Sequence, residues 1–396
     1  MLLSIIIPTK DRYHYLRECI TTILAVDSDD FELVIQDNTP NNVEILPFIQ
    51  EIKDDRLKYY YDSKHASEVE NVNRAIIHSN GRYVCFIGDD DSITTSLVDA
   101  VRYVDKRGID CLSFYVSGYN WPDMEFSSKA KKDANLFFNK DADGSIIPMN
   151  PMKQLKQALK DTICGVPYKV PRMYHAVVAR KCLNKIYEIT HTYIPGPSPD
   201  MAGAVSISLV AGKAIFIKAH LIVSGFCYKS ARGEGKRLEH QGNIQDKPWL
   251  PENQIELWDT ELPKYFSGET ILAQSAYEAF CAMKKPQYIK WIQYGNVYAR
   301  LYKHHKTIRK QLVKFMLKKP SRLFLFLGSV INKMFLRIKK VIGKQVGLDE
   351  YNDKFTLTEA CKITNERNSK INIDKNQIRY DEPMKKHTSF KVGGNA

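Results

Sequence analysis

The first hundred residues alternate between continuous apolar runs and apolar positions spaced three or four residues apart. The continuous runs predict buried strands at residues 2–7, 31–35, 57–61 and 82–87. The spaced positions predict helices over residues 15–26 and 69–78, between the first two strands and before the fourth. This alternation predicts an α/β fold with a doubly wound, largely parallel sheet.

Polar residues follow three of these predicted strands. The turn at residues 8–12 follows the first strand, Asp37 ends the second, and Asp89, Asp90 and Asp91 follow the fourth. Parallel strands bring these residues to one sheet edge, which is where ligands bind in such folds. Three adjacent carboxylates repel one another unless a cation or hydrogen-bond donors hold them. The pattern therefore predicts a site for Mn²⁺ or Mg²⁺ with a nucleotide phosphate, although an isolated Asp in such a place is more often a turn residue.

Four segments, in this order, resemble the nucleotide-sugar-binding half of the family 2 glycosyltransferases: residues 4–12, 32–38, 71–75 and 81–91. The resemblance is good over residues 1–115, thinner to about residue 235, and absent afterwards. It implies a GT-A-type doubly wound mixed sheet and the transfer of a sugar from a nucleoside diphosphate-sugar. Similar members make bacterial surface polysaccharides such as O-antigen or capsule.

The resemblance also implies roles for single residues. Donor contacts fall on Pro8, Thr9, Arg12, Asp37, Arg74, Asp89 and Asp90. Asp89 is assigned to the ribose and Asp90 or Asp91 to the metal ion, since three adjacent aspartates leave the register open. For Arg74, a solvated helix residue is nearly as good an explanation.

Asp200 is the candidate general base. It ends a stiff turn, residues 194–199, that contains three prolines and a glycine, and it precedes an apolar helix over residues 201–210. The matching position in the family supplies the base, and a helix N-terminus favours the ionised carboxylate that can accept a proton. By position alone, Asp200 also fits a helix N-cap, a role worth about 1 kcal/mol.

Further candidates lie around this turn. Tyr174 and His175 are predicted to line an acceptor pocket, although a structural histidine explains His175 equally well. Lys236 and Arg237, in a Gly-rich loop, are predicted to neutralise phosphate charge. His240 is a candidate third metal ligand, against the simpler explanation of a surface histidine.

The net charge of +13 is concentrated in one segment. The 70 residues between Glu278 and Asp349 contain no Asp or Glu but 17 Lys or Arg, whereas the rest of the chain has a net charge of −4. A stripe of Leu323, Leu327, Val330, Ile331, Met334, Ile338 and Val341 runs beside basic residues at 333, 337, 340 and 344. This pattern predicts an interfacial helix on an anionic membrane. A helical bundle with a basic rim is the main alternative, and nucleic-acid binding is disfavoured because no recognition motif accompanies the charge.

The sequence thus predicts a catalytic domain over residues 1–245, with a nucleotide-sugar half (1–115) and an acceptor half (116–245). A helical, basic, amphipathic region follows (246–347), and then a polar, poorly ordered tail (348–396). The N-terminal apolar run is too short for a signal sequence, and the eight cysteines show no metal or disulfide pattern. We therefore expect a cytoplasmic protein, peripheral on the inner face of the membrane.

The function predicted from these features is an inverting, metal-dependent glycosyltransferase acting on a lipid-linked saccharide. One alternative is a sugar nucleotidyltransferase, although the turn at residues 8–12 lacks the glycines of a phosphate loop. A second alternative is a non-catalytic protein, binding membrane or nucleic acid, on a degenerate transferase scaffold.

Overall fold

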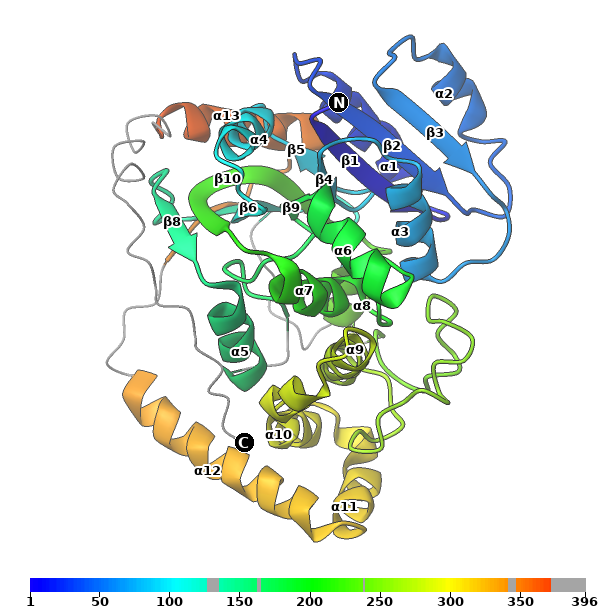
Figure 1. Ribbon diagram of the computed structural model, residues 1–396. Helices are drawn as coiled ribbons and strands as arrows, with labels where there is room; N and C mark the ends of the chain where they lie inside the picture. The colour runs from blue at the N-terminus through cyan, green and yellow to red at the C-terminus, as the bar shows by residue number, and fades with distance from the viewer. Residues whose placement is uncertain (127–134, 162–164, 238, 341–346, 372–396) are drawn as a thin grey trace.

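The structure, a computed structural model of the chain, describes residues 1–126, 135–161, 165–237, 239–340 and 347–371. One mixed β-sheet forms its centre, in the order β11-β7-β6-β9-β4-β1-β2-β3, with β10 pairing with β5, β6 and β8 (Figure 1). The strands are β1 (Leu3–Thr9), β2 (Phe31–Asp37), β3 (Leu57–Tyr61), β4 (Tyr83–Phe86), β5 (Ser92–Ile93), β6 (Cys111–Asn120), β7 (Leu136–Asn139), β8 (Ile146–Met149), β9 (Ala176–Ala179), β10 (Ala214–Phe226) and β11 (Leu348–Tyr351). Strands β1 to β4 are parallel to one another, whereas β9 runs antiparallel to β4 and β6.

Helices cover both faces of the sheet. One face packs against α1, α4 and α13, and the other against α3, α5, α6 and α7. These helices are α1 (Tyr13–Leu24), α3 (Glu68–Ile77), α4 (Ser96–Lys106), α5 (Pro151–Asp161), α6 (Arg180–Thr190), α7 (Pro199–Val210) and α13 (Leu357–Ser369), with the short α2 (Leu46–Glu51) before β3 and α8 (Ala231–Arg237) after β10. The predicted α/β fold with a doubly wound mixed sheet is confirmed.

The apolar run of the first strand explains this two-sided burial. In β1, Ile5 and Ile7 belong to the core under α1 and α4, whereas Ile6 belongs to the core under α3 and α7. Because successive side chains of a strand point to opposite faces, a strand covered on both sides needs a continuous apolar run. The run therefore predicted a central strand correctly.

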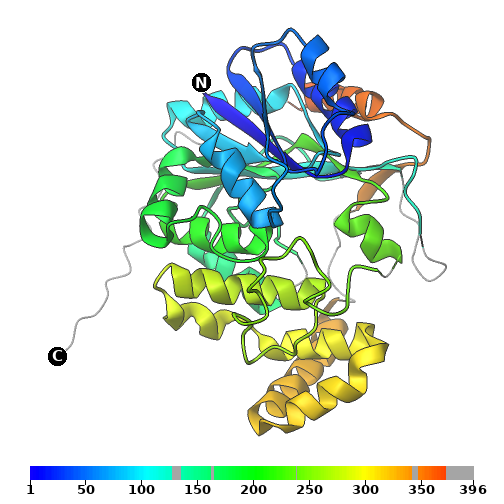
Figure 2. The same cartoon turned by 90° about the vertical axis from the view of Figure 1, so that its right-hand side faces the viewer.

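A helical region follows the sheet domain, as the sequence predicts. It contains α9 (Gly268–Ala282), η1 (Pro286–Trp291), α10 (Tyr294–His304), η2 (Lys306–Ile308), α11 (Arg309–Leu317) and α12 (Pro320–Lys340). Figure 2 shows the yellow helices of this region stacked beneath the green helices of the sheet domain, where α9 packs against α7. Within the described part of the chain, no helix combines the length and apolarity needed to cross a bilayer.

The C-terminal segment differs from the poorly ordered tail that its composition predicts. Strand β11 pairs with β7, and α13 places Leu357, Ala360 and Cys361 in the core beside α1. A capping box between Thr356 and Glu359 begins this helix. Apart from the exposed Leu348, the few apolar residues named in this core are spaced so that they pack against the sheet, which overall polarity does not reveal. Residues 372–396 lie outside the described residues.

His220 of β10 joins these late elements to the sheet. It is 1% exposed, its Nε2 accepts the backbone N–H of Asn139 at 3.0 Å, and its carbonyl accepts the side-chain amide of Asn368 at 2.6 Å. Burial, with a smaller contribution from Arg367, lowers the pKa of His220 to about 4. The folded protein therefore holds this imidazole neutral.

This burial makes stability depend on pH in a defined window. Because the pKa is about 4 in the folded protein and near its ordinary value of about 6.5 when unfolded, the unfolded state binds the proton first as the pH falls. We expect the free energy of unfolding to decrease by up to about 3 kcal/mol between about pH 6.5 and 4. Chemical denaturation of wild type and His220→Gln across this range checks it, with exposed His65→Gln as the control. Equal pH slopes in wild type and His220→Gln would contradict the assignment.

Candidate active site

Asp91 is the most deeply fixed of the three aspartates that follow β4. Its side chain is fully buried, and its Oδ1 accepts the backbone N–H of Gly225 at 2.7 Å. Its Oδ2 accepts the N–H of Gly88 at 2.6 Å and lies 2.7 Å from Nε2 of His175. Both oxygens are thus occupied inside the protein. This corrects the prediction that Asp91 is a metal ligand, and it gives His175 a structural role in place of a pocket-lining one.

Asp89 and Asp90 turn toward Arg12 instead. Asp89 accepts a hydrogen bond from the hydroxyl of Thr9 at 2.6 Å, and its Oδ1 lies 3.1 Å from Nε of Arg12. Oδ2 of Asp90 lies 2.8 Å from Nη2 of the same guanidinium. Burial raises the pKa of both carboxyl groups, and Arg12 opposes that rise. The structure therefore brings together Thr9, Arg12, Asp89 and Asp90, as the sequence predicts.

The same two carboxylates fit a divalent cation. Oδ1 of Asp89 and Oδ2 of Asp90 are buried and accept no hydrogen bond, so Arg12 is their counter-charge in the described structure. No cluster of three or more His, Cys, Asp or Glu side chains suited to a metal occurs in the described part of the chain. Two carboxylates are the usual protein share for an ion whose other ligands are phosphate oxygens and water.

Asp37 is enclosed at the end of β2. Its Oδ2 accepts hydrogen bonds from the hydroxyls of Tyr13 and Tyr59, both at 2.7 Å, and its Oδ1 accepts the N–H of Thr39 at 2.8 Å. The side chain is 0% exposed. Its oxygens thus already have three donors within the protein, so the predicted donor contact would require one of the tyrosines to move. Pro8, in β1, pairs with Gln36 of the same strand as Asp37.

Tyr174 connects the aspartates to the acceptor side. Its ring stacks on that of His175, with 3.8 Å between the ring centroids, and contacts that of Phe86, with 4.8 Å between the centroids. Burial raises the pKa of its hydroxyl, and the negative charges of Asp91, Asp90 and Asp200 raise it further. The ring contact with Phe86, the last residue of β4, places Tyr174 at the strand end that carries the aspartates.

Asp200 stands in the first turn of α7 and leaves its carboxylate free. Ser198 is the N-cap residue, which rules out the N-cap explanation for Asp200. Among the described residues, no hydrogen bond or ion pair engages the Asp200 carboxylate, and the residue is half-buried. Burial raises its pKa, while Arg172 and His175 lower it. Burial thus outweighs the contributions of Arg172 and His175, which makes Asp200 a stronger base than an ordinary carboxylate.

Glu68 and Arg172 belong to the site, but the sequence analysis did not identify them. Glu68 reaches solvent, yet protein surrounds it closely enough for burial, and then Asp200, to raise its pKa to about 7. Arg172 is 7% exposed, donates to the carbonyl of Val166, and partly neutralises Asp200. The capping box that begins α3, between Ser67 and Glu70, is a sequence signal that fixes where Glu68 stands.

Four predicted residues have partners other than the aspartates. Arg74 pairs with Asp62 at 3.1 Å, which agrees with the solvated-helix explanation. In α8, Lys236 lies over the ring of Phe126 and Arg237 binds the carbonyl of Tyr228 at 2.7 Å. His240 bonds Glu234 at 2.9 Å and stacks on Trp249. In the part of the chain that the structure describes, His240 belongs to no cluster of three or more metal-ligating side chains, so its role as a third metal ligand stays a prediction.

Comparison with known proteins adds a family to this geometry. Residues 4–181 match the family model of Glycosyl transferase family 2. A relative from Campylobacter jejuni, GalNAc(5)-diNAcBac-PP-undecaprenol beta-1,3-glucosyltransferase, is 22% identical over 347 residues, covering 86% of this chain and 97% of its own. Among solved structures, S. aureus TarS 1-349 gives a TM-score of 0.44 at 14% identity, covering 81% of this chain and 89% of that one. The mannosyltransferase PcManGT from Pyrobaculum calidifontis gives a TM-score of 0.37 at 11% identity. That match covers 92% of this chain and 87% of the PcManGT chain.

The matched residues contain most of β1, the aspartates after β4, and Tyr174, whereas Asp200 lies beyond them. The chain therefore carries a family 2 glycosyltransferase domain over residues 4–181, and by that domain it is a glycosyltransferase.

Proposed function

We propose that this protein is an inverting, divalent-metal-dependent transferase that moves a sugar from a nucleoside diphosphate-sugar to a lipid-linked saccharide. The observation that carries the proposal is the pair of buried carboxylates, Asp89 and Asp90, that face Arg12 at the ends of β4 and β1, within the residues that match the family model. The named acceptor of the Campylobacter relative, a saccharide on undecaprenyl diphosphate, supports the acceptor class. Synthesis of a bacterial surface polysaccharide such as O-antigen or capsule is the corresponding pathway.

On the donor side, Asp89 and Asp90 would hold Mn²⁺ or Mg²⁺ while Thr9 fixes the orientation of Asp89. When bound, the ion supplies positive charge to the leaving diphosphate. In this proposal the metal ion replaces the guanidinium of Arg12 at the two carboxylates, and Arg12 moves to contact a phosphate of the donor. A guanidinium suits this exchange, because it binds carboxylate and phosphate through the same planar set of donors.

On the acceptor side, Asp200 removes the proton of the attacking hydroxyl. Transfer with inversion requires the hydroxyl to approach the sugar from the face opposite the leaving diphosphate, and a carboxylate must accept its proton. Asp200 has no internal bond to break before it does so. Arg172 lowers the pKa of Asp200, and the charge of Asp200 in turn raises the pKa of Glu68.

The first prediction from the proposed function concerns the catalytic base. Asp200→Asn should reduce turnover by about 100-fold or more, the usual contribution of general-base catalysis, while donor binding stays unchanged. Glu68→Gln, which changes a neighbouring carboxylate, should have a much smaller effect, and Glu188→Gln on the exposed face of α6 should have none. Transfer assays and donor titration calorimetry measure the two quantities. If Glu68→Gln abolished turnover and Asp200→Asn did not, the base would be Glu68.

The second prediction separates the aspartates. Asp90→Asn should remove the enhancement of donor binding by Mn²⁺ or Mg²⁺ and leave the melting temperature near that of wild type. Asp91→Asn should instead lower the melting temperature, because it removes a buried charge that accepts three hydrogen bonds. Calorimetry with and without metal, together with thermal melting, provides both readouts. If the wild-type protein bound the donor equally well with and without Mn²⁺ or Mg²⁺, this result would contradict the metal site.

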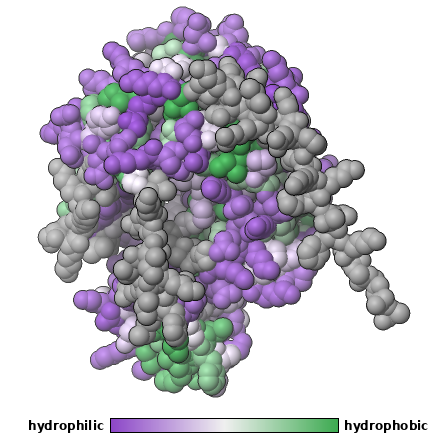
Figure 3. All heavy atoms as spheres, turned by 90° about the vertical axis from the view of Figure 1, so that its left-hand side faces the viewer, coloured by the Kyte–Doolittle hydropathy of each residue, from purple (hydrophilic) through white to green (hydrophobic). Residues whose placement is uncertain are grey.

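The helical region presents an apolar and basic surface suited to a membrane. Exposed apolar side chains on α11 and α12 are Val313 (36%), Leu317 (61%), Phe324 (73%), Leu325 (45%), Leu327 (46%) and Ile331 (54%). Figure 3 shows a hydrophobic patch at the foot of the molecule, where α11 and α12 meet in Figure 1. Exposed Lys310 and Lys314 lie on α11, and exposed Lys318 and Lys319 lie in the turn between the two helices. We propose peripheral binding to the inner face of the cell membrane through this surface.

The face of α12 opposite the exposed apolar side chains packs against the rest of the helical region. This packing determines which face of α12 is turned to solvent. Arg322 pairs with Glu261 at 3.1 Å and donates to the carbonyl of Thr260 at 2.7 Å, and Phe326 contacts the ring of Tyr302. Side chains at positions 333–340 of α12, and all of Val341 and Lys344, lie outside the described residues. The proposal therefore depends on the first half of the helix.

The third prediction tests this surface. The double substitution Phe324→Glu and Ile331→Glu should abolish flotation of the full-length protein with liposomes that contain anionic lipid. Both side chains are exposed, so the melting temperature should not change. Val43→Glu, at a site that is equally exposed (67%) but remote in sequence, serves as the control. Unchanged flotation of the double variant would contradict the proposal.

A further inference from the structure

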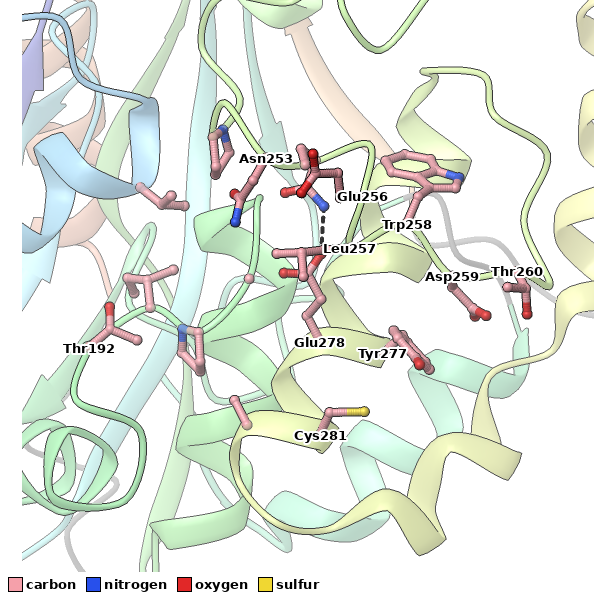
Figure 4. Close-up of a pocket in the computed structure, with 17 residues that line it drawn as sticks. Thr192, Asn253, Glu256, Leu257, Trp258, Asp259, Thr260, Tyr277, Glu278 and Cys281 are labelled. Atoms are coloured by element: carbon pink, nitrogen blue, oxygen red, sulfur yellow. Dashed lines mark hydrogen bonds between the residues drawn. The ribbon is translucent and has the colours of Figure 1, made fainter.

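A cavity of about 730 Å³ lies outside the group of residues described above. Its wall is formed by residues 251–260, by α9, by the loop at 192–196 and by Val69 of α3 (Figure 4). None of the three aspartates after β4 lines it, nor does Asp200. A cavity of this size accommodates a small oligosaccharide or a drug-sized ligand.

The cavity adjoins the segments that position the acceptor-side carboxylates. Val69 directly follows Glu68, and Gly196 lies on the loop that leads into Asp200. That loop is fixed to α9, because the backbone N–H of Ser198 donates to the hydroxyl of Ser275 at 3.0 Å. A molecule bound in the cavity is therefore next to the elements that carry the candidate base.

The charge of the lining limits what the cavity binds. Its ionisable oxygen groups come from Glu256, Asp259 and Glu278, and no Lys, Arg or His of the described chain lines it. The lining of this cavity is therefore acidic, although the whole protein has a net charge of +13. A phosphate or other anion would meet only like charge there, so the diphosphates of donor and acceptor are excluded as occupants.

The fixed polar groups suit hydroxyl-rich ligands. Oε1 of Glu278 accepts from the side-chain amides of Gln254 at 2.5 Å and Gln274 at 2.6 Å, which holds the carboxylate in one orientation. The ring of Tyr277, on the same turn of α9, adds an apolar surface beside it, and Figure 4 shows both residues on that helix. An oriented acceptor next to an aromatic face matches a sugar ring, which has hydroxyl donors at its edge and C–H groups on its faces. A purely apolar chain would leave these polar groups without partners, at a cost.

We propose that this cavity binds neutral sugar units of the acceptor, beyond the unit that receives the transferred sugar. The identity of the ligand as acceptor rests on the function proposed above, whereas the saccharide chemistry rests on the lining alone. The site would make the enzyme favour acceptors that already carry several sugars, because extra units add contacts that a monosaccharide lacks.

Binding of free saccharides to the full-length protein, without donor, tests this proposal. A panel of trisaccharides of N-acetylglucosamine, N-acetylgalactosamine and glucose is titrated against the matching monosaccharides by ligand-observed NMR. We expect at least one trisaccharide to bind more tightly than its monosaccharide. Glu278→Gln and Tyr277→Ala should each weaken that binding by about fivefold, the equivalent of one hydrogen bond. Glu252→Gln, an exposed neighbour outside the cavity, should leave it unchanged.

Three results would overturn the proposal: no trisaccharide binds, both cavity variants bind as well as wild type, or farnesyl phosphate displaces the saccharide. Nucleotide-sugar binding by the same variants reports whether they are folded, and Tyr277→Ala keeps the test valid if Glu278→Gln is unstable. Loss of sugar transfer with intact saccharide binding would count against the proposed function alone. Intact transfer without saccharide binding would count against the cavity alone.

Discussion

The buried carboxylate of Asp91 is the contact on which the active site depends. It joins three segments that lie far apart in sequence: the turn at Gly88, the end of β10 at Gly225, and His175. An ionised group in this environment is stable only because donors surround it. The rest of the site is arranged around this anchor, so one residue that touches no substrate determines where the functional residues stand.

Two backbone features show how closely the segments approach this anchor. A Cβ on Gly225 would lie 1.8 Å from the carbonyl oxygen of Asp90, so only glycine fits there. His175 adopts a positive φ of 54°, which is unusual for a residue with a side chain. Its backbone N–H bonds the carbonyl of Phe86 at 3.0 Å, and its ring reaches Asp91. The unfavourable backbone is thus offset by two bonds and places Tyr174 beside the donor carboxylates.

The sequence predicts the sheet well, and it predicts that Thr9 and Asp89 lie at one sheet edge, for a physical reason. Strand runs and strand-end polar residues are local features, and parallel pairing brings them to one edge, as with Thr9 and Asp89. The errors arise where the outcome depends on distant contacts. Local sequence does not show that Gly88, Gly225 and His175 would surround the carboxylate of Asp91. Nor does it show that Tyr13 and Tyr59 would enclose Asp37.

Composition misleads in a related way in the C-terminal segment and in the charged regions. Residues 348–371 have a polar average, yet Leu357, Ala360 and Cys361 pack into the core. Likewise, the net charge of +13 describes neither the acidic cavity at Glu278 nor the buried aspartates. Charge in this protein is separated by location: acid where neutral sugars and a metal ion would bind, and base on the exposed helices. A lipid-linked saccharide has the same division, with neutral sugars at one end and a diphosphate at a membrane surface at the other. The division of charge in the protein thus matches the division of charge in such an acceptor. This match is the physical reason to propose that one acceptor contacts both the acidic cavity and the basic helices.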